Sequence, residues 1–105
     1  KDEARLDWSR PAVELERLVR AFHPWPICHS TLGGDAIKVH AAELGEGSGT
    51  PGSILAADKS GLIVACGEGV LRLTRLQLPG GKALAFSDLY NSRREQFAPG
   101  LVLGA

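Results

Sequence analysis

Residues 70–78 read VLRLTRLQL and form the longest segment with the alternating pattern of a β-strand. Leucines stand at every second position up to Leu73 and again from Leu76 onward, but the two runs differ in parity. Because side chains along a strand point alternately to opposite faces, all four leucines can reach one core only through an irregularity. We therefore predict a bulge or sharp bend near Thr74-Arg75, a device by which a small sheet curls into a barrel.

The sequence on both sides of this segment also reads as short strands separated by turns. Apolar and polar residues alternate over 36–44, whereas residues 45–52 contain too much glycine to hold a regular element. Ser87 is the predicted N-cap of a short late helix that ends near Arg93. The predicted strands, besides residues 70–78, cover residues 36–44, 53–57, 62–66 and 101–103.

The first quarter of the chain predicts an amphipathic helix over about residues 10–22. Ser9 is the expected N-cap, and Pro11 falls in the first turn, where its missing N–H costs nothing. The helix ends before His23-Pro24-Trp25-Pro26, because a residue that precedes proline disfavours the helical conformation. Trp25 is expected to be a buried plug between the helix and the sheet.

Length and composition describe one domain with an ordinary core. The chain has 105 residues, 44% of them hydrophobic, and its 12 basic and 12 acidic residues give zero net charge, which argues against an indiscriminate polybasic binder. Apolar runs span only a few residues, so we predict no membrane helix and no signal-peptide core. Two cysteines do not make a disulfide scaffold. Methionine is absent, even from position 1, so we expect either a processed product or, in preference, a piece of a longer protein.

Side chains that could bind a metal or act as nucleophiles show no recognisable spacing. The presence of two cysteines allows a Cys28–Cys66 disulfide, and no other feature of the sequence supports one. Both Gly-Glu-Gly stretches lack the following helix that a phosphate-binding loop needs, and they read as turns. No nucleophile motif is present, so an autonomous active site is not expected. The potential metal ligands, none of them paired at the spacing of a zinc site, are His23, Cys28, His29, His40 and Cys66.

The charges are distributed unevenly along the chain. Residues 71–105 carry five basic and two acidic side chains, whereas residues 28–70 carry two and five. A handful of phosphate contacts from the basic part would give weak, salt-dependent binding of nucleic acid. Arginine at a helix C-terminus also complements the helix dipole, which offers a structural reading of Arg93 and Arg94. The few aromatic residues are not interleaved with the basic strand residues, which argues against a base-stacking surface.

Several motifs resemble the C-terminal domain of methionyl-tRNA formyltransferases. The resemblance covers about residues 6–103, and its most specific string is Arg20-Ala21-Phe22-His23-Pro24-Trp25-Pro26. The family usually has Asn where His23 stands, and histidine can supply a similar hydrogen bond. The weaker matches follow in the order of the family: Asp7-Trp8-Ser9, residues 67–73, residues 76–80 and Pro99-Gly100.

The resemblance implies a mainly β fold, namely a small OB-like Greek-key barrel preceded by an N-terminal helix and carrying one short late helix. Residues 1–27 would form a linker and the capped helix, and residues 28–105 the barrel, in one unit. In such cytoplasmic enzymes an N-terminal Rossmann-type catalytic domain moves a formyl group from 10-formyltetrahydrofolate to initiator methionyl-tRNA. That domain is not in this sequence, so the chain alone is predicted to be non-catalytic and to bind no cofactor.

The implied role is that of a basic surface that helps to hold the tRNA. An alternative is a structural or protein-interaction barrel, since similar barrels occur on formyltransferases that act on nucleotide sugars and on formyltetrahydrofolate dehydrogenase. The candidate tRNA contacts, three from motif position and four from charge alone, are Arg20, Arg72 and Arg75, then Lys38, Lys82, Arg93 and Arg94.

Overall fold

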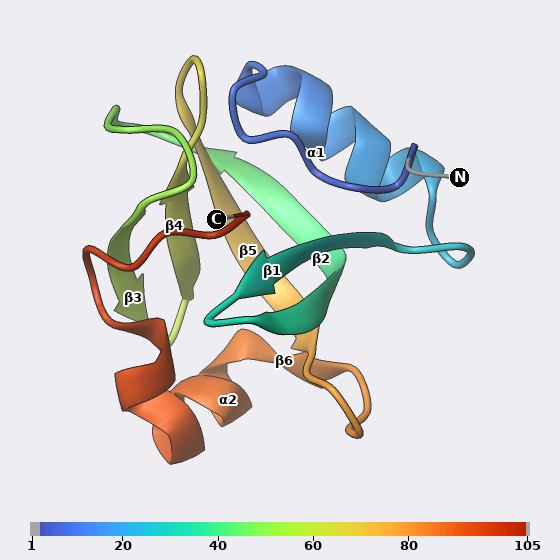
Figure 1. Cartoon of the computed structure of the whole chain (residues 1–105), viewed down its shortest axis with the longest axis vertical. Coiled ribbons are helices and arrows are strands. Elements are labelled where there is room, and N and C mark those ends of the chain that lie inside the picture. The colour runs from blue at the N-terminus through green and yellow to red at the C-terminus, as the bar shows by residue number, and fades with distance from the viewer. Residues whose placement is uncertain (1–2, 105) are drawn as a thin grey trace.

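A strongly curved antiparallel sheet carries one helix along one side and a second helix at its far end (Figure 1). The computed structural model describes residues 3–104. The strand order is β1-β2-β5-β4-β3, and β6 pairs with the last part of β5. The predicted mainly β fold with an N-terminal helix is confirmed. The elements are α1 (Ala12–Ala21), β1 (Cys28–Leu32), β2 (Asp35–Gly45), β3 (Ile54–Asp58), β4 (Gly61–Ala65), β5 (Val70–Gln77), β6 (Leu84–Ala85), α2 (Phe86–Arg93) and the 3-10 helix η1 (Arg94–Phe97).

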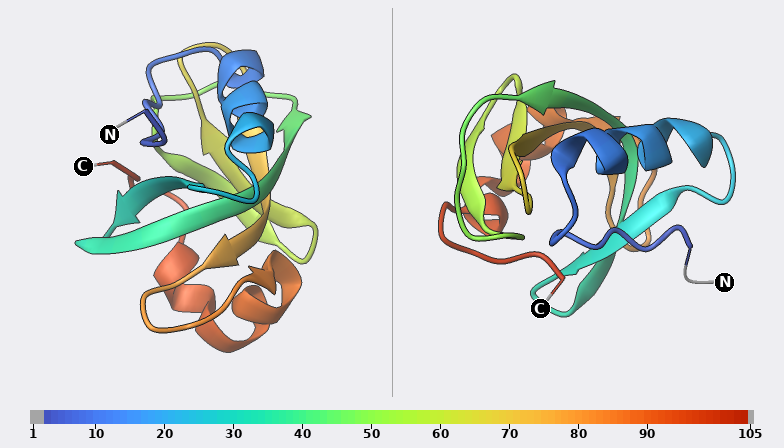
Figure 2. Two further views of the ribbon diagram at one scale, coloured as in Figure 1. Left: turned by 90° about the vertical axis from the view of Figure 1, so that its right-hand side faces the viewer. Right: turned by 90° about the horizontal axis from the view of Figure 1, so that it is seen from above.

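The sheet curls as predicted, but strand pairing does not close it into a complete barrel. β1 and β3 are its two edges. Residues 101–104, which we call the C-terminal strap, cross the opening between these edges (Figure 2). Leu103 donates its N–H to Gly52 O at 2.7 Å, just before β3, and Gly104 donates to Thr31 O of β1 at 2.8 Å. The strand predicted over 101–103 is therefore a single isolated bridge within this strap.

The irregularity predicted in β5 is confirmed. The register between β2 and β5 shifts twice, between Val39 and Ala41 and between Ala41 and Ala42. One residue of each strand, His40 and Thr74, is skipped in the pairing. All four leucines of residues 70–78 are buried on the core side as a result.

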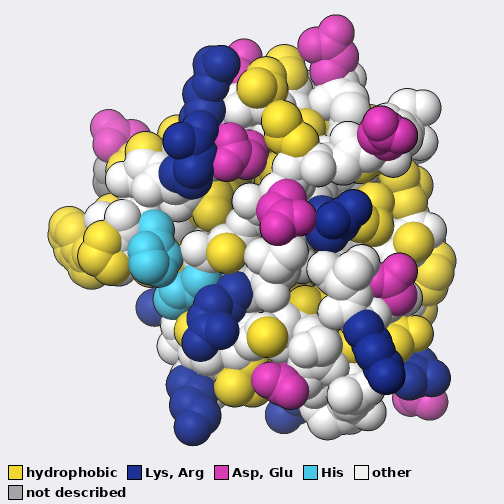
Figure 3. Space-filling model, turned by 180° about the vertical axis from the view of Figure 1, so that it is seen from behind, with side chains coloured by type: hydrophobic (Ala, Val, Ile, Leu, Met, Phe, Trp, Pro, Cys, Tyr) yellow, Lys and Arg dark blue, Asp and Glu magenta, His cyan; other side chains and the backbone are white. Residues whose placement is uncertain are grey.

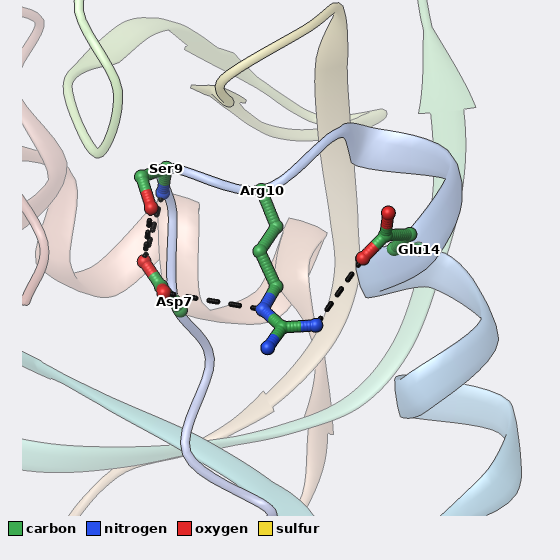
Figure 4. Close-up of polar contacts among 4 residues, drawn as sticks. All are labelled: Asp7, Ser9, Arg10 and Glu14. Carbon is green, nitrogen blue, oxygen red and sulfur yellow. Dashed lines mark hydrogen bonds and ion pairs between the residues drawn. The ribbon is translucent and has the colours of Figure 1, made fainter.

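The start of α1 differs from its prediction. Pro11 is the N-cap, with φ −62° and ψ 145°. Ser9 Oγ donates instead to Asp7 Oδ1 at 2.6 Å, and the Arg10 guanidinium lies between Asp7 and Glu14 (Figure 4). The prediction of a Ser9 cap is wrong: the helix begins at Ala12, which puts Pro11 at the N-cap position, and the Ser9 hydroxyl points to Asp7 instead of accepting from an N–H of the first turn.

The segment before α1 is held against the sheet by backbone hydrogen bonds of Ala4 and Leu6 with His29 of β1, by one buried side-chain hydrogen bond and by one close backbone approach. Trp8 is buried, and its Nε1 donates to Ser30 Oγ of β1 at 3.0 Å. Gly67 N donates to Arg10 O at 2.9 Å, and a Cβ at Gly67 would overlap the carbonyl oxygen of Ser9. Only glycine allows the chain before α1 to lie this close to the turn between β4 and β5.

The turn after α1 corrects the prediction for Trp25. Ile27 N donates to Phe22 O at 2.9 Å, and both X–Pro bonds between them are cis. Ile27 is buried and Phe22 packs against the core, whereas all of residues 23–26 are exposed. Trp25 is 82% exposed and is not a plug, because Phe22 and Ile27 occupy the inner positions at the two ends of the turn.

Two strands were not predicted, and the late helix begins earlier than expected. β1 was not predicted because the polar Ser30 is one of its inward residues, which hides the alternation of apolar and polar residues. β6 was not predicted because it has only two residues. Ser87 is not the N-cap of α2; Ala85 is. The helix begins at Phe86, whose side chain is 1% exposed and packs into the core.

Replacement of Gly67 by alanine is expected to destabilise the fold by about 1–3 kcal/mol, the usual range for overpacking a filled position. The new methyl group would overlap the Ser9 carbonyl and push the N-terminal segment away from the sheet. Urea unfolding followed by circular dichroism measures the loss. Gly81→Ala is the matched control, because a Cβ there meets only Leu78 O at 3.5 Å. A Gly67→Ala protein as stable as this control would contradict the contact.

Candidate nucleic-acid interface

Three cations come together where β2 and β5 pair and where the next loop begins. Lys38 and Gln77 are direct partners in the sheet, so their side chains share one face. Arg75 precedes Gln77 by two residues, and the buried Leu76 between them shows that Arg75 points outward. The loop after β5 adds the exposed Lys82. We call this group the cationic face: Lys38, His40, Arg75, Gln77 and Lys82.

Hydrogen bonds attach the loop to the strands of the cationic face. His40 Nε2 and Gln77 Oε1 lie 2.9 Å apart. Two loop carbonyls accept from β5 side chains: Gln77 Nε2 donates to Gly81 O at 3.0 Å, and Arg75 Nη2 donates to Ala83 O at 3.2 Å. Lys82 stands between these two carbonyls in sequence, so its backbone is held beside Arg75 and Gln77.

The positive charge of the cationic face is uncompensated. Lys38, Arg75 and Lys82 are exposed, and none of them forms an ion pair with another residue of 3–104. Figure 3 shows dark-blue cations next to the cyan histidine side chains on the rear of the molecule. An anion that reaches this face meets three positive charges that form no ion pair with a carboxylate of residues 3–104.

Arg72 and Arg75 lie on the same strand but in different surroundings. Arg72 points outward, as predicted, yet its Nη1 lies 3.2 Å from Glu43 Oε1 of β2. Its Nε is buried and has no hydrogen-bond partner within the described residues. Its stem lies against Gly61, where a Cβ would overlap Arg72 Cγ. The charge of Arg72 is therefore partly compensated, and its side chain is held in place.

The remaining three candidate cations lie on helices: Arg20 on α1, Arg93 at the end of α2 and Arg94 at the start of η1. Arg20 donates two hydrogen bonds to Glu16, at 2.6 and 3.1 Å, and this contact raises the pKa of Arg20. The Arg94 guanidinium lies 4.5 Å from the centre of the Tyr90 ring. Arg93 lines a shallow hollow beside the β1–β2 turn. The structure thus brings together only Lys38, Arg75 and Lys82 of the seven candidates, and their contact with tRNA stays a prediction.

Sequence reasoning missed two groups that border these cations. His40 could have been found from its position two residues after Lys38, which puts both on the same strand face. His23 could not, since only the fold brings it to β2: its ring centre lies 5.9 Å from that of His40, at an interplanar angle of 76°.

The described residues form neither a metal-binding group nor a disulfide. Within residues 3–104, no three His, Cys, Asp or Glu side chains are grouped so that they could hold a metal ion. Cys28 and Cys66 are free, buried thiols, and the disulfide allowed by their number does not form. Burial raises the pKa of each thiol to about 11. No helix in the described part of the chain has the length and apolar content needed to span a membrane.

Comparison with known proteins gives a consistent set of matches. A family model described as "Formyl transferase, C-terminal domain" matches residues 1–94. The methionyl-tRNA formyltransferase of Ectopseudomonas mendocina (strain ymp) is 89% identical over 104 residues, which are 99% of this chain and 33% of that protein. The methionyl-tRNA formyltransferase of Pseudomonas paraeruginosa (strain DSM 24068 / PA7) is 79% identical over 104 residues, 99% of this chain and 34% of that protein. The chain spans about one third of the length of these relatives.

Solved structures with a similar fold include HypX from Aquifex aeolicus. A variant of HypX matches with a TM-score of 0.74 and 19% identity over 94% of this chain and 18% of that chain. HypX in complex with tetrahydrofolic acid matches with a TM-score of 0.72 and 21% identity over 88% of this chain and 17% of that chain. At these identities the likeness concerns the fold alone.

Both thiols are expected to resist alkylation in the folded protein at pH 8, because a pKa of about 11 keeps them protonated and burial excludes the reagent. Iodoacetamide treatment followed by mass spectrometry should find the folded chain unmodified and the urea-unfolded chain doubly labelled. Rapid labelling without urea would contradict the buried state.

The same burial predicts that stability depends on pH. Since the unfolded thiols release their protons near pH 9, the free energy of unfolding should fall as the pH rises from about 9 to about 11.

Proposed function

The chain belongs to the formyl transferase C-terminal domain family, and from this membership we propose that it helps to hold initiator methionyl-tRNA for formylation. The identity with two methionyl-tRNA formyltransferases confirms the resemblance of its motifs to the C-terminal domain of such enzymes. Because the chain spans only about one third of those proteins, we assign the transfer step to an N-terminal Rossmann-type catalytic domain with 10-formyltetrahydrofolate as its cofactor. The chain would act as a cytoplasmic accessory domain that binds no cofactor itself.

The observation that carries this proposal is the uncompensated charge of the cationic face. Lys38, Arg75 and Lys82 extend from two paired strands and the adjoining loop, with no acidic partner among the described residues. Folded RNA is recognised largely through its backbone and shape, and such a row of cations suits neighbouring phosphates.

The expected affinity is modest and falls steeply with salt. Each phosphate contact contributes a slope of about 0.7–0.9 in a plot of log affinity against log salt concentration. Three contacts therefore predict a loss of roughly 20- to 40-fold between 50 and 200 mM salt. Zero net charge for the whole chain agrees with a domain that assists a second one rather than binding strongly alone.

The other candidate cations rank lower in this proposal. Arg20 and Arg72 already contact carboxylates, so a phosphate would have to replace a bond that exists. Arg93 and Arg94 are exposed and form no ion pair within residues 3–104, which makes them the next candidates after the cationic face.

Neutralising the cationic face is expected to weaken tRNA binding. Lys38→Gln combined with Arg75→Gln should lower the salt slope for an initiator tRNA transcript by roughly one per cation removed. Filter binding or fluorescence anisotropy from 25 to 200 mM salt measures this slope. Lys59→Gln, which removes one positive charge from the turn between β3 and β4, is the control for a loss of charge outside the cationic face and should bind like the wild type. Wild-type affinity that does not respond to salt would refute the electrostatic role.

A second function, bracing or protein contact, is favoured by one apolar surface. Val13 and Leu44 are 42% and 52% exposed, and they line the same shallow hollow beside the start of α1. Another protein surface could pack against neighbouring exposed apolar side chains of this kind.

Charge reversal in a formyltransferase that carries this chain separates the two functions. Lys38→Glu combined with Arg75→Glu is expected to lower kcat/KM for formylation by about tenfold or more, mainly through KM, as two phosphate contacts are lost. If the domain only braces the enzyme, this variant keeps its activity, and Val13→Ser combined with Leu44→Ser lowers the thermal stability instead. Steady-state formylation and thermal unfolding of both variants give the answer.

A further inference from the structure

One large aromatic side chain is exposed, although every other aromatic residue is buried or half-buried. Trp25 is 82% exposed, whereas Trp8, Phe86 and Phe97 are 5%, 1% and 0% exposed. A buried tryptophan typically removes about 150–250 Å² of surface from water. The Trp25 indole therefore offers a large apolar surface that the described fold leaves in solvent.

The turn that carries Trp25 is anchored at both ends. Ile27 N donates to Phe22 O at 2.9 Å, and both of these side chains pack inward. Pro24 and Pro26 restrict the φ angles on either side of Trp25. The indole is thus presented on a short turn with restricted backbone freedom rather than on a long loop.

This turn lies beside the cationic face. The His23 ring meets the His40 ring edge to face, with 5.9 Å between their centres. His40 in turn bonds Gln77, which is the direct sheet partner of Lys38. In Figure 3 a hydrophobic protrusion, the cyan histidines and dark-blue cations follow one another on one side of the rear surface.

We infer that Trp25 stacks on an unpaired base of the RNA bound at the cationic face, an inference that rests on the proposed function. Cations that follow a nucleic-acid backbone, with an aromatic ring beside them, are the combination by which proteins hold unpaired nucleotides. A base inside a duplex has both faces covered by its neighbours, so only an unpaired base can offer a face to the indole. His23, two residues before Trp25, meets His40 of the cationic face, and this setting suits RNA better than an apolar protein surface.

Binding and fluorescence of Trp25 variants test this contact. The 105-residue chain is titrated at low salt with an initiator tRNA transcript, an eight-nucleotide single-stranded RNA and a fully paired RNA duplex. Trp8 is buried, so quenching by RNA reports on Trp25, the other tryptophan of the chain. Trp25→Ala removes the ring, and Trp25→Phe keeps an aromatic face while removing the indole signal. Thermal unfolding should be the same for both variants and the wild type, because the side chain is exposed.

The expected result is a loss of affinity specific to unpaired RNA. Trp25→Ala should bind the transcript and the single strand roughly 5- to 150-fold more weakly, the range for one base stacked on an aromatic ring. Trp25→Phe should bind close to the wild type, and duplex binding should not change in either variant. The transcript and the single strand should quench the wild type but not Trp25→Phe.

The possible failures are distinguishable. If Trp25→Ala binds the transcript like the wild type while Lys38→Gln with Arg75→Gln still weakens binding, the inference is overturned and the proposed function stands. If the wild type binds no RNA at low salt, both are overturned. If Trp25→Ala keeps its RNA affinity but lowers the thermal stability of a formyltransferase that carries this chain, the indole covers a protein surface and the inference is wrong.

Discussion

The double register shift between β2 and β5 is the constraint on which the rest of the structure depends. Without it, the four leucines of residues 70–78 would divide between the two faces of the sheet, and half of them would point into water. By skipping His40 and Thr74, the pair of strands turns so that all four reach the core. Two residues lose their partners in the ladder, whereas each leucine recovered from solvent contributes about 1.5–3 kcal/mol.

The same shift has a second effect on the outer face. His40 stands at the skipped position, and its ring bonds Gln77 and meets the ring of His23. The turn after α1 is thereby joined to the two strands that carry the free cations. A chain with zero net charge can still display a positive face, because carboxylates such as Glu16 and Glu43 are paired with other arginines.

Features set by neighbours in sequence could be predicted, and features set by competition in space could not. The parity change within residues 70–78 predicts the bulge, since alternation along a strand is local. The exposure of Trp25 could not be predicted in this way, because Phe22 and Ile27 were equally apolar candidates for the inner positions of the same turn. Motif position and charge together named seven cations for the site. They could not separate the free ones from Arg72, whose partner Glu43 lies 29 residues away in sequence.

The C-terminal strap has a consequence for how this sheet behaves among copies of itself. An open sheet has two edges whose unpaired N–H and C=O groups can template a strand from another molecule. The strap hydrogen-bonds to Thr31 at the end of β1 and to Gly52 just before β3, so backbone groups on both sides of the opening are already satisfied. At this opening the fold resists edge-to-edge aggregation without closing into a full ring of strands.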